Sequence, residues 1–279
     1  ERVSRLVDSL PAGEVIDIVH HLAAPLPLMM ICSLLGLPED EWTTFLEWSD
    51  AAIPGAAPMS DERRAELMAE SEGVLRAHIE ERRRVVGEDY VADLVAADID
   101  GRPLTDDEIY MIVNQLLIAG NETTRNLISG GLVALAESPA QWRRLRDDPG
   151  LVPTAVEELL RWTTPVVAFM RTATAETELA GERVHEGDPV LLVYASANRD
   201  ETEFGSTAEL LDVGRRPNHH LAFGFGPHVC VGAALARLEG RVVLEALTER
   251  FAGIEVAGPV ERTPSGIIAG VHRAHVRLT

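Results

Sequence analysis

The stretch Phe223-Gly-Phe-Gly-Pro-His-Val-Cys-Val-Gly232 decides the fold, and Ala-Ala-Leu-Ala-Arg237 follows it. Two glycines precede Cys230 within this stretch and one follows it. Glycine has no Cβ, so it permits positive φ angles and lets the backbone approach a flat ligand closely. A final amphipathic helix is predicted over about 231–251, directly after the cysteine. Because the free amides and the dipole at a helix start stabilise a thiolate, the stretch predicts a stabilised thiolate at Cys230.

The same stretch is similar, position for position, to the cysteine-loop signature of the cytochrome P-450 family, Phe-Gly-x-Gly-x-His-x-Cys-x-Gly. The resemblance implies that Cys230 ligates the iron of haem b (iron protoporphyrin IX), where electron donation by a thiolate favours cleavage of the O–O bond. It also implies that neighbouring positions bind the haem, with His228 as a partner of a propionate. These cofactor-binding positions are Ala222, Phe223, Gly224, His228, Gly232 and Ala236.

Two other interpretations of the cysteine are weaker. The first is that Cys230 is only a buried core residue before a helix. This interpretation does not explain why six positions of the signature match. A zinc site built from His219, His220, His228 and Cys230 would lack the paired spacing and the second thiolate of a structural zinc site. The haem-thiolate interpretation is therefore preferred.

The cytochrome P-450 family also carries Glu-x-x-Arg on a helix well before the cysteine, and Glu158-Leu-Leu-Arg161 matches it. The i, i+3 spacing puts both side chains on one face of a helix. The irregular segment before the cysteine loop aligns with the family's third member of this set and offers Arg215. The resemblance implies a buried structural clamp behind the haem, whereas Glu158 and Arg161 taken alone would be an ordinary exposed pair.

The segment Ala119-Gly-Asn-Glu-Thr-Thr124 is similar to the part of the family's long helix that crosses the haem. Gly120 and a bond from the Thr123 hydroxyl to the Ala119 carbonyl favour a local kink. By resemblance, Ala119 and Gly120 bind the cofactor, and Thr123 and Glu122 are catalytic. Thr123 assists dioxygen activation and Glu122 helps to relay protons. Taken alone, the segment would also fit close packing between helices.

Arg171 aligns with the family's second propionate partner. A buried propionate needs an opposite charge or a hydrogen-bond donor, although an isolated arginine here would more often be a solvated strand residue. The resemblance also implies an apolar substrate pocket, which a hydrophobic substrate requires. Its expected lining residues are Ile118, Val166, Val167 and Phe169.

The whole chain, residues 1–279, is predicted to form one cytochrome P-450 domain that is mainly α with a minor β part. Helices are expected over about 1–162 and 231–251, and a β-rich and irregular part over about 165–230. A capping box, Thr105-Asp-Asp-Glu108, predicts the start of a helix of more than thirty residues that passes through the protein centre. The chain has no initiator Met and begins like a helix already under way. We therefore expect the N-terminal third of a usual family member to be missing.

Composition excludes several other classes of protein. The formal net charge of −20 argues against binding to nucleic acid or to an anionic membrane. The apolar run from Leu26 to Leu37 is too short to span a bilayer. Only two cysteines are present, Cys32 and Cys230, so there is no disulfide framework and a cytoplasmic location is expected. Cys32 lies in the apolar run and is predicted to be a core residue.

The resemblance implies an oxidoreductase, a haem-thiolate monooxygenase of the bacterial soluble type. Such an enzyme takes electrons from a ferredoxin-type donor with its reductase and inserts one oxygen atom of O2 into a lipophilic small molecule. A terpenoid, a steroid, or a fatty acyl or polyketide compound would suit the apolar pocket. The segment 164–173 is somewhat similar to enzymes that hydroxylate sterol or branched-lipid side chains. The alternative is a haem-binding fragment without catalytic activity.

Overall fold

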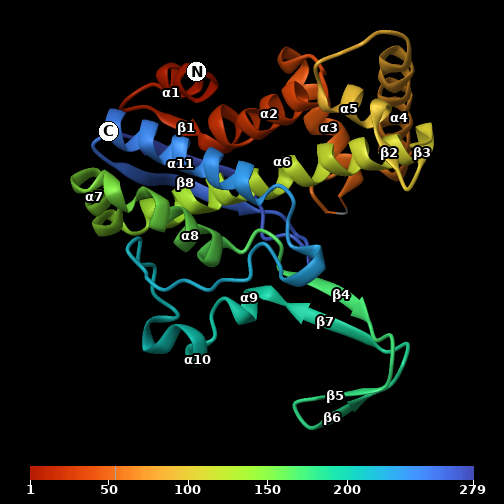
Figure 1. The fold of residues 1–279 in the computed structure, drawn as a ribbon. Helices are drawn as coiled ribbons and strands as arrows, with labels where there is room; N and C mark the ends of the chain where they lie inside the picture. Colours follow the sequence, from red (N-terminus) through yellow and green to blue (C-terminus); the bar gives the residue numbers. More distant parts are fainter. Residues whose placement is uncertain (54) are drawn as a thin grey trace.

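The computed structural model describes residues 1–53 and 55–279 of the chain. Helices make up most of the molecule, and the long helix α6 runs through its middle (Figure 1). The α-helices are α1 (Arg2–Ser9), α2 (Pro25–Leu35), α3 (Trp42–Ala52), α4 (Asp61–Arg84), α5 (Tyr90–Ala96), α6 (Asp106–Ala136), α7 (Pro139–Asp147), α8 (Val152–Thr163), α9 (Tyr194–Ala197), α10 (Glu201–Phe204) and α11 (Ala233–Arg250). The short π and 3-10 turns are η1 (Val19–Ala23), η2 (Glu39–Glu41), η3 (Pro149–Leu151), η4 (Gly205–Thr207) and η5 (Gly226–His228).

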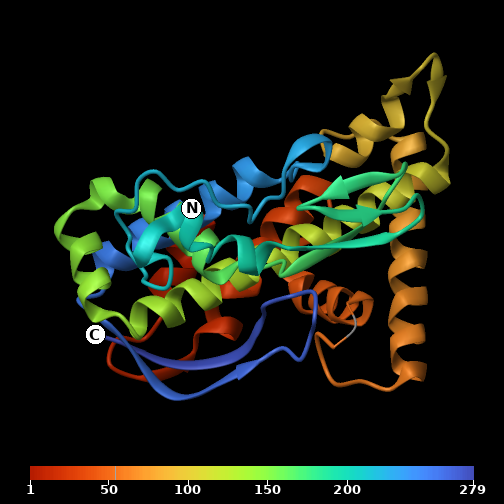
Figure 2. The ribbon, with the colours of Figure 1, turned by 90° about the horizontal axis from the view of Figure 1, so that it is seen from below.

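The strands form small antiparallel sheets. The largest has the order β1-β9-β8 and lies along one side of the helical part in Figure 2. Its strands are β1 (Val15–Asp17), β9 (Val271–Leu278) and β8 (Ile254–Arg262). The strand pairs are β2 (Asp98–Ile99) with β3 (Arg102–Pro103), β4 (Ala168–Thr172) with β7 (Pro189–Val193), and β5 (Thr177–Leu179) with β6 (Glu182–Val184). The architecture is mainly α with a minor β part, as predicted.

The secondary structure differs from the prediction at two places. The first half of the chain was expected to be helical, but β1 pairs with β9 at the other end of the chain, with Val15 opposite Arg277. A three-residue strand of this kind is stabilised by its distant partner and leaves no local pattern. In the part of the chain predicted to be β-rich and irregular, the strand β7 ends at Val193. Residues Tyr194–Ala197 form α9 instead, and the amide of Asn198 donates to the Tyr194 carbonyl at 2.9 Å.

The capping box fixes the start of α6, as predicted. The Thr105 hydroxyl accepts a hydrogen bond from the Glu108 amide at 3.3 Å, and the Glu108 carboxylate accepts from the Thr105 amide at 2.9 Å. Arg102 also donates to Glu108, and these bonds with those from Thr105 lower the pKa of Glu108 to about 2. The helix then continues for 31 residues and ends at Ala136, shortly before Pro139.

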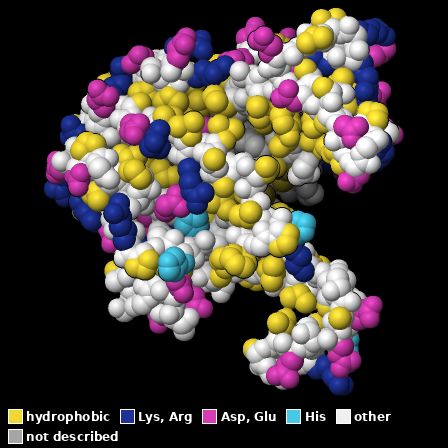
Figure 3. Space-filling view, viewed as in Figure 1, with side chains coloured by type: hydrophobic (Ala, Val, Ile, Leu, Met, Phe, Trp, Pro, Cys, Tyr) yellow, Lys and Arg dark blue, Asp and Glu magenta, His cyan; other side chains and the backbone are white. Residues whose placement is uncertain are grey.

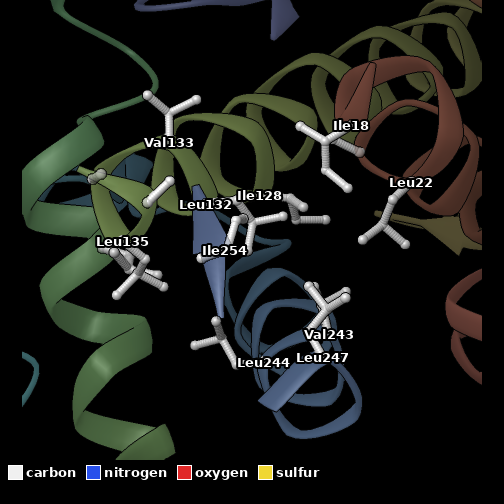
Figure 4. Packing of buried hydrophobic residues seen from close by; sticks show 14 of the residues in the cluster. Ile18, Leu22, Ile128, Leu132, Val133, Leu135, Val243, Leu244, Leu247 and Ile254 are labelled. Carbon is white, nitrogen blue, oxygen red and sulfur yellow. The ribbon is translucent and has the colours of Figure 1, made fainter. Parts of the chain in front are cut away.

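The C-terminal half of α6 is buried in one hydrophobic cluster. Side chains of this half belong to one cluster with those of α8, α11 and the strand β8. Figure 4 shows the part of the cluster to which α6, α11 and β8 contribute. Each large aliphatic side chain removed from water here contributes roughly 1.5–3 kcal/mol. The residues labelled in Figure 4 are Ile18, Leu22, Ile128, Leu132, Val133, Leu135, Val243, Leu244, Leu247 and Ile254.

The N-terminal half of α6 packs in a second cluster, against α2, α3, α4 and α5. Cys32 is part of this cluster and is fully buried, which confirms that it is a core residue. Burial raises the pKa of its thiol to about 12. The two clusters therefore fix α6 along its length. Three residues of α6 in the second cluster are Ile109, Val113 and Leu117.

The β4–β7 ribbon and the β5–β6 hairpin project from the helical part in Figure 1. The ribbon starts directly after α8, and its last strand leads into α9. Several of its apolar side chains are exposed. In the space-filling view of Figure 3, hydrophobic side chains line the hollow between the helical part and this ribbon.

Candidate haem-thiolate site

We call residues Phe223–Gly232 the Cys loop. The Cys230 amide donates to the Phe223 carbonyl at 2.9 Å, which closes the loop on itself. Gly224 and Gly226 have φ angles of 71° and 74°, a backbone region that disfavours other residues, so both glycines are needed for the turn. α11 begins at Ala233, and the cysteine thus lies just before a helix, as predicted. Its thiol is exposed.

The Cys loop exposes large apolar side chains. Phe225 is 86% exposed and Val231 is 90% exposed, and Val229 lies between them with more than half of its surface accessible. In the view of Figure 1 the loop is drawn between α6 and the β4–β7 ribbon, whose Phe169, Met170 and Leu191 are also exposed. Large apolar side chains exposed on both elements are unfavourable in water and indicate a surface that a ligand covers. An exposed thiol among apolar side chains is a donor set that fits a haem with a thiolate ligand.

Glu158, Arg161 and Arg215 meet in a buried clamp. Arg161 donates two hydrogen bonds of 2.8 Å to the two carboxylate oxygens of Glu158, and Arg215 donates to the same carboxylate at 3.0 Å. The Asn218 side chain and the Asp212 amide add two further donors to Glu158. Arg161 also donates to backbone carbonyls of the irregular segment, at Asn198, Ala208 and Leu210. The clamp therefore ties α8 to the irregular segment that leads to the Cys loop.

The α6 segment has the hydroxyl bond that the sequence predicted. The Thr123 hydroxyl donates to the Ala119 carbonyl at 2.8 Å. Helical structure continues through Gly120, and a Cβ at this position would come within 3.2 Å of Ile31 on α2. Gly120 therefore also serves close packing between the two helices. Ala119 is exposed, and Ile118 and Thr123 are partly exposed, so this face of α6 remains open.

Glu122 lies on the buried side of α6. Its carboxylate forms an ion pair with Arg125, one turn later, and accepts a hydrogen bond from Asn126 at 3.0 Å. Arg125 also donates to Asp50, at the end of α3, at 3.1 Å. Burial raises the pKa of Asp50, although the charge of Arg125 partly offsets this effect. Neither Asp50 nor Arg125 could be predicted as part of this region from the sequence, because nothing local links the two residues.

The neighbouring residues reinforce this contact between α3 and α6. The Asn121 amide donates to the Ser49 hydroxyl at 2.9 Å, and both residues are fully buried. Glu122 is thus held in a closed polar cluster next to the open face that carries Thr123.

The predicted pocket residues lie around the start of β4. Val166 and Val167 are partly exposed, and Phe169 is exposed over about half of its surface, 48%. The Val167 amide donates to the Ile267 carbonyl at 2.7 Å, and Val166 pairs with Ile268. The turn between β8 and β9 thus lies beside the predicted lining. The turn was not predicted from the sequence, because only the tertiary structure brings it beside β4.

The two predicted propionate partners are both exposed. Arg171 lies on β4, and its guanidinium donates to the Met170 carbonyl at 3.0 Å and lies 5.9 Å from the Phe169 ring centre. His228 ends the short turn η5 within the Cys loop. Both side chains are accessible to an anionic group, on the elements that carry the exposed apolar surface.

The zinc interpretation finds no support in the geometry. Within residues 1–53 and 55–279, no three His, Cys, Asp or Glu side chains are grouped to hold a metal ion. His219 and His220 contact Glu203 and Glu157 instead. Among the described helices, none is both long and apolar enough to cross a membrane.

The fold and the cysteine site place the chain among haem-thiolate proteins, and comparison with known proteins identifies the family. The cytochrome P-450 family model matches residues 150–263. Linalool 8-monooxygenase of Pseudomonas putida is 39% identical over 99% of this chain and 69% of its own length. Steroid C26-monooxygenase of Mycobacterium tuberculosis (strain H37Rv) is 36% identical over 98% of this chain and 70% of its own length. The chain belongs to the cytochrome P-450 family.

Solved structures agree with this assignment. CYP109E1 from Bacillus megaterium, solved in complex with corticosterone, has a TM-score of 0.88 and 34% identity, over 99% of this chain and 77% of that one. The cytochrome P-450 PksS of the Bacillus subtilis bacillaene polyketide synthase has a TM-score of 0.91 and 33% identity, over 100% of this chain and 72% of that one. The fold prediction and the enzyme class, a cytochrome P-450 monooxygenase, are thereby confirmed. The cofactor of this family is haem b, and the Cys loop fits it.

Proposed function

We propose that this cytochrome P-450 inserts one oxygen atom of O2 into a lipophilic small molecule, with electrons from a ferredoxin-type protein and its reductase. The single observation that carries the proposal is the exposed thiol of Cys230 on a glycine-shaped loop with an uncovered apolar surface. In this proposal Cys230 ligates the iron, and Arg171 and His228 hold the propionates. The bound haem would supply dioxygen binding and the oxidising chemistry.

The proposed roles of the protein's own side chains follow from their positions. The Thr123 hydroxyl, on the open face of α6, is both a donor and an acceptor and can hold a proton close to the reacting centre. Glu122 is proposed to relay protons toward Thr123. Because its carboxylate is paired with Arg125, this relay requires the side chain to rotate out of the ion pair.

The substrate proposal rests on the chemistry of the pocket. Val166, Val167, Phe169 and Ile118 are apolar and at least partly exposed, which suits a hydrophobic ligand. Relatives are named for linalool, for steroids and for methyl-branched lipids. We propose terpenoids, steroids and fatty acyl or polyketide compounds as the substrate class, with sterols and branched lipids as the first compounds to test.

The test is the absorption spectrum of the reduced protein with carbon monoxide. We expect the far-red Soret band that marks a thiolate ligand, and its loss in Cys230→His. A band at the shorter wavelength of a histidine- or thiol-ligated haem in the unmodified protein would overturn the proposed site. A thiolate band with no product from any lipophilic compound, when electrons are supplied, would support the alternative of a haem-binding fragment without turnover.

A further inference from the structure

Glu157 lies beside the clamp glutamate on α8 but has different partners. Its carboxylate accepts two hydrogen bonds from the Arg237 guanidinium on α11, at 2.8 and 2.9 Å. It also accepts from His220 Nε2 at 3.1 Å. The second ring nitrogen of His220 accepts from the Ala222 amide at 3.2 Å, which leaves the proton on Nε2. Glu157 therefore joins α8, α11 and the segment before the Cys loop.

Phe223, the first residue of the Cys loop, is packed between the two partners of Glu157. The Arg237 guanidinium lies 4.6 Å from the centre of the Phe223 ring, and the His220 ring lies 6.0 Å from it. A guanidinium over an aromatic face is a favourable contact. The Phe223 carbonyl in turn accepts from the Cys230 amide. A continuous path of contacts thus runs from Glu157 to the cysteine.

Two residues on this path, Glu157 and Arg237, are charged. Burial disfavours the ionised form of Glu157, but the bonds and charges of His220 and Arg237 outweigh it and lower the pKa of Glu157 to about 2. Hydrogen bonding to Glu157 raises the pKa of Arg237, and the negative charge of Glu157 adds to this effect. The Arg237 cation is therefore paired with Glu157 and lies over Phe223, whose carbonyl accepts from the Cys230 amide. Glu157 holds this cation in place and partly neutralises it.

We propose that Glu157 is a positioning residue for the haem-thiolate site, which fixes the Cys loop and sets the charge beside Cys230 through His220 and Arg237. The inference rests on the proposed function, because it requires Cys230 to be the iron ligand. Glu157 is not one of the three clamp residues, Glu158, Arg161 and Arg215.

The experiment measures the one-electron reduction of ferric to ferrous iron in the haem-loaded full-length protein, by titration with dithionite and mediators. Glu157→Gln leaves Arg237 without its counter-ion, so the equilibrium constant for reduction should rise roughly threefold to tenfold. Arg237→Gln leaves the Glu157 carboxylate without the guanidinium, so the same constant should fall by a similar factor. The double variant should lie near the unmodified protein, because the two residues act as one pair.

The equilibrium constant for reduction should thus rise in Glu157→Gln and fall in Arg237→Gln. A purely structural role of Glu157 would change the constant in the same direction in both variants. Glu245→Gln is the matched control: it breaks an ion pair with Arg241 on the same helix and should leave the constant unchanged. The proposal would be overturned if Glu157→Gln and the control changed the equilibrium constant for reduction equally. It would also be overturned if Glu157→Gln and Arg237→Gln changed this constant in the same direction. If Glu157→Gln does not retain haem, the equilibrium constants for reduction of Arg237→Gln and Arg237→Lys are compared instead. Only Arg237→Gln removes the positive charge, so only this variant should lower the constant.

The failure of this inference is distinguishable from that of the proposed function. An unmodified protein without the thiolate band with carbon monoxide would refute both. An unmodified protein with that band, and variants with unchanged reduction, would refute the positioning role of Glu157 alone.

Discussion

Arg125 lies between two carboxylates from different helices: Glu122, one turn earlier on α6, and Asp50 at the end of α3, at 3.1 Å. All three side chains are buried or nearly so. Buried charges are tolerated only when they are paired, so this contact fixes the end of α3 against the proposed catalytic segment. The position of α3 and the orientation of Glu122 are therefore linked.

Arg125→Leu should destabilise the protein strongly. The change leaves Glu122 buried without its cation, and breaking a buried pair costs about 3–5 kcal/mol. The free energy of unfolding, measured in urea at pH 7, gives the result. Arg63→Leu is a matched control, because Arg63 pairs with Glu66 three residues later and with Glu47 on α3, but at the surface. It should cost less than about 1 kcal/mol, and equal losses for both variants would contradict the argument.

Thr123→Ala should separate oxygen consumption from product formation. Removal of the hydroxyl removes the donor and acceptor proposed to hold a proton at the reacting centre, so product per dioxygen consumed should fall roughly tenfold or more. Oxygen uptake, hydrogen peroxide release and product are measured together. Ser129→Ala is the control, since the Ser129 hydroxyl makes the same kind of bond to Arg125, four residues earlier, but within the core. Unchanged coupling in Thr123→Ala would refute its assigned role.

Glu158→Gln should prevent stable folding. Arg161 is fully buried and Arg215 nearly so, and both donate to this carboxylate. The variant loses the negative charge that compensates two buried cations, at a cost of about 3–5 kcal/mol. The yield of folded protein and its unfolding in urea measure the effect. Glu249→Gln, at an exposed position of α11, should behave like the unmodified protein. A Glu158→Gln protein of normal stability would show that the clamp contributes little.

Glu239 makes stability depend on pH. It is buried on α11, and burial raises its pKa to about 8. The folded state therefore holds this proton in a range where the unfolded state has lost it. The stability is fully present below the ordinary pKa of glutamate, and it falls as the pH rises toward 8. At pH 8.5 the loss should be on the order of 4 kcal/mol.

Glu239→Gln removes the ionisable group, so the free energy of unfolding should decrease less as the pH rises. The measurement is urea unfolding of both proteins at pH 5 and pH 8.5, which gives the free energy of unfolding in each state. Between pH 5 and pH 8.5, the free energy of unfolding should fall less in the variant than in the unmodified protein. A difference between the two proteins that stays constant with pH would contradict the assignment.

The sequence predicted local geometry correctly where a motif spans only a few residues. The glycines of the Cys loop, the capping box of α6, the Thr123 bond to Ala119 and the i, i+3 pair in α8 all lie within a few residues, so backbone rules and spacing were sufficient. Arg215 required the family resemblance, because 54 residues separate it from Arg161 and no periodicity joins them. The same holds for Arg171, whose exposed position on β4 is not distinctive by itself.

The sequence by itself determined the family and the mainly helical class, because these depend on residue identity and on short-range hydrogen bonding. It also predicted that Cys230 is the iron ligand. Only the tertiary structure decided which charges share a partner. It brought Asp50 to Arg125, joined Glu157 to both His220 and Arg237, and paired β1 with the end of the chain. The physical reason is that a buried charge or a short strand is stabilised by whatever the fold places beside it. That neighbour is set by the packing of distant segments, which no local pattern encodes.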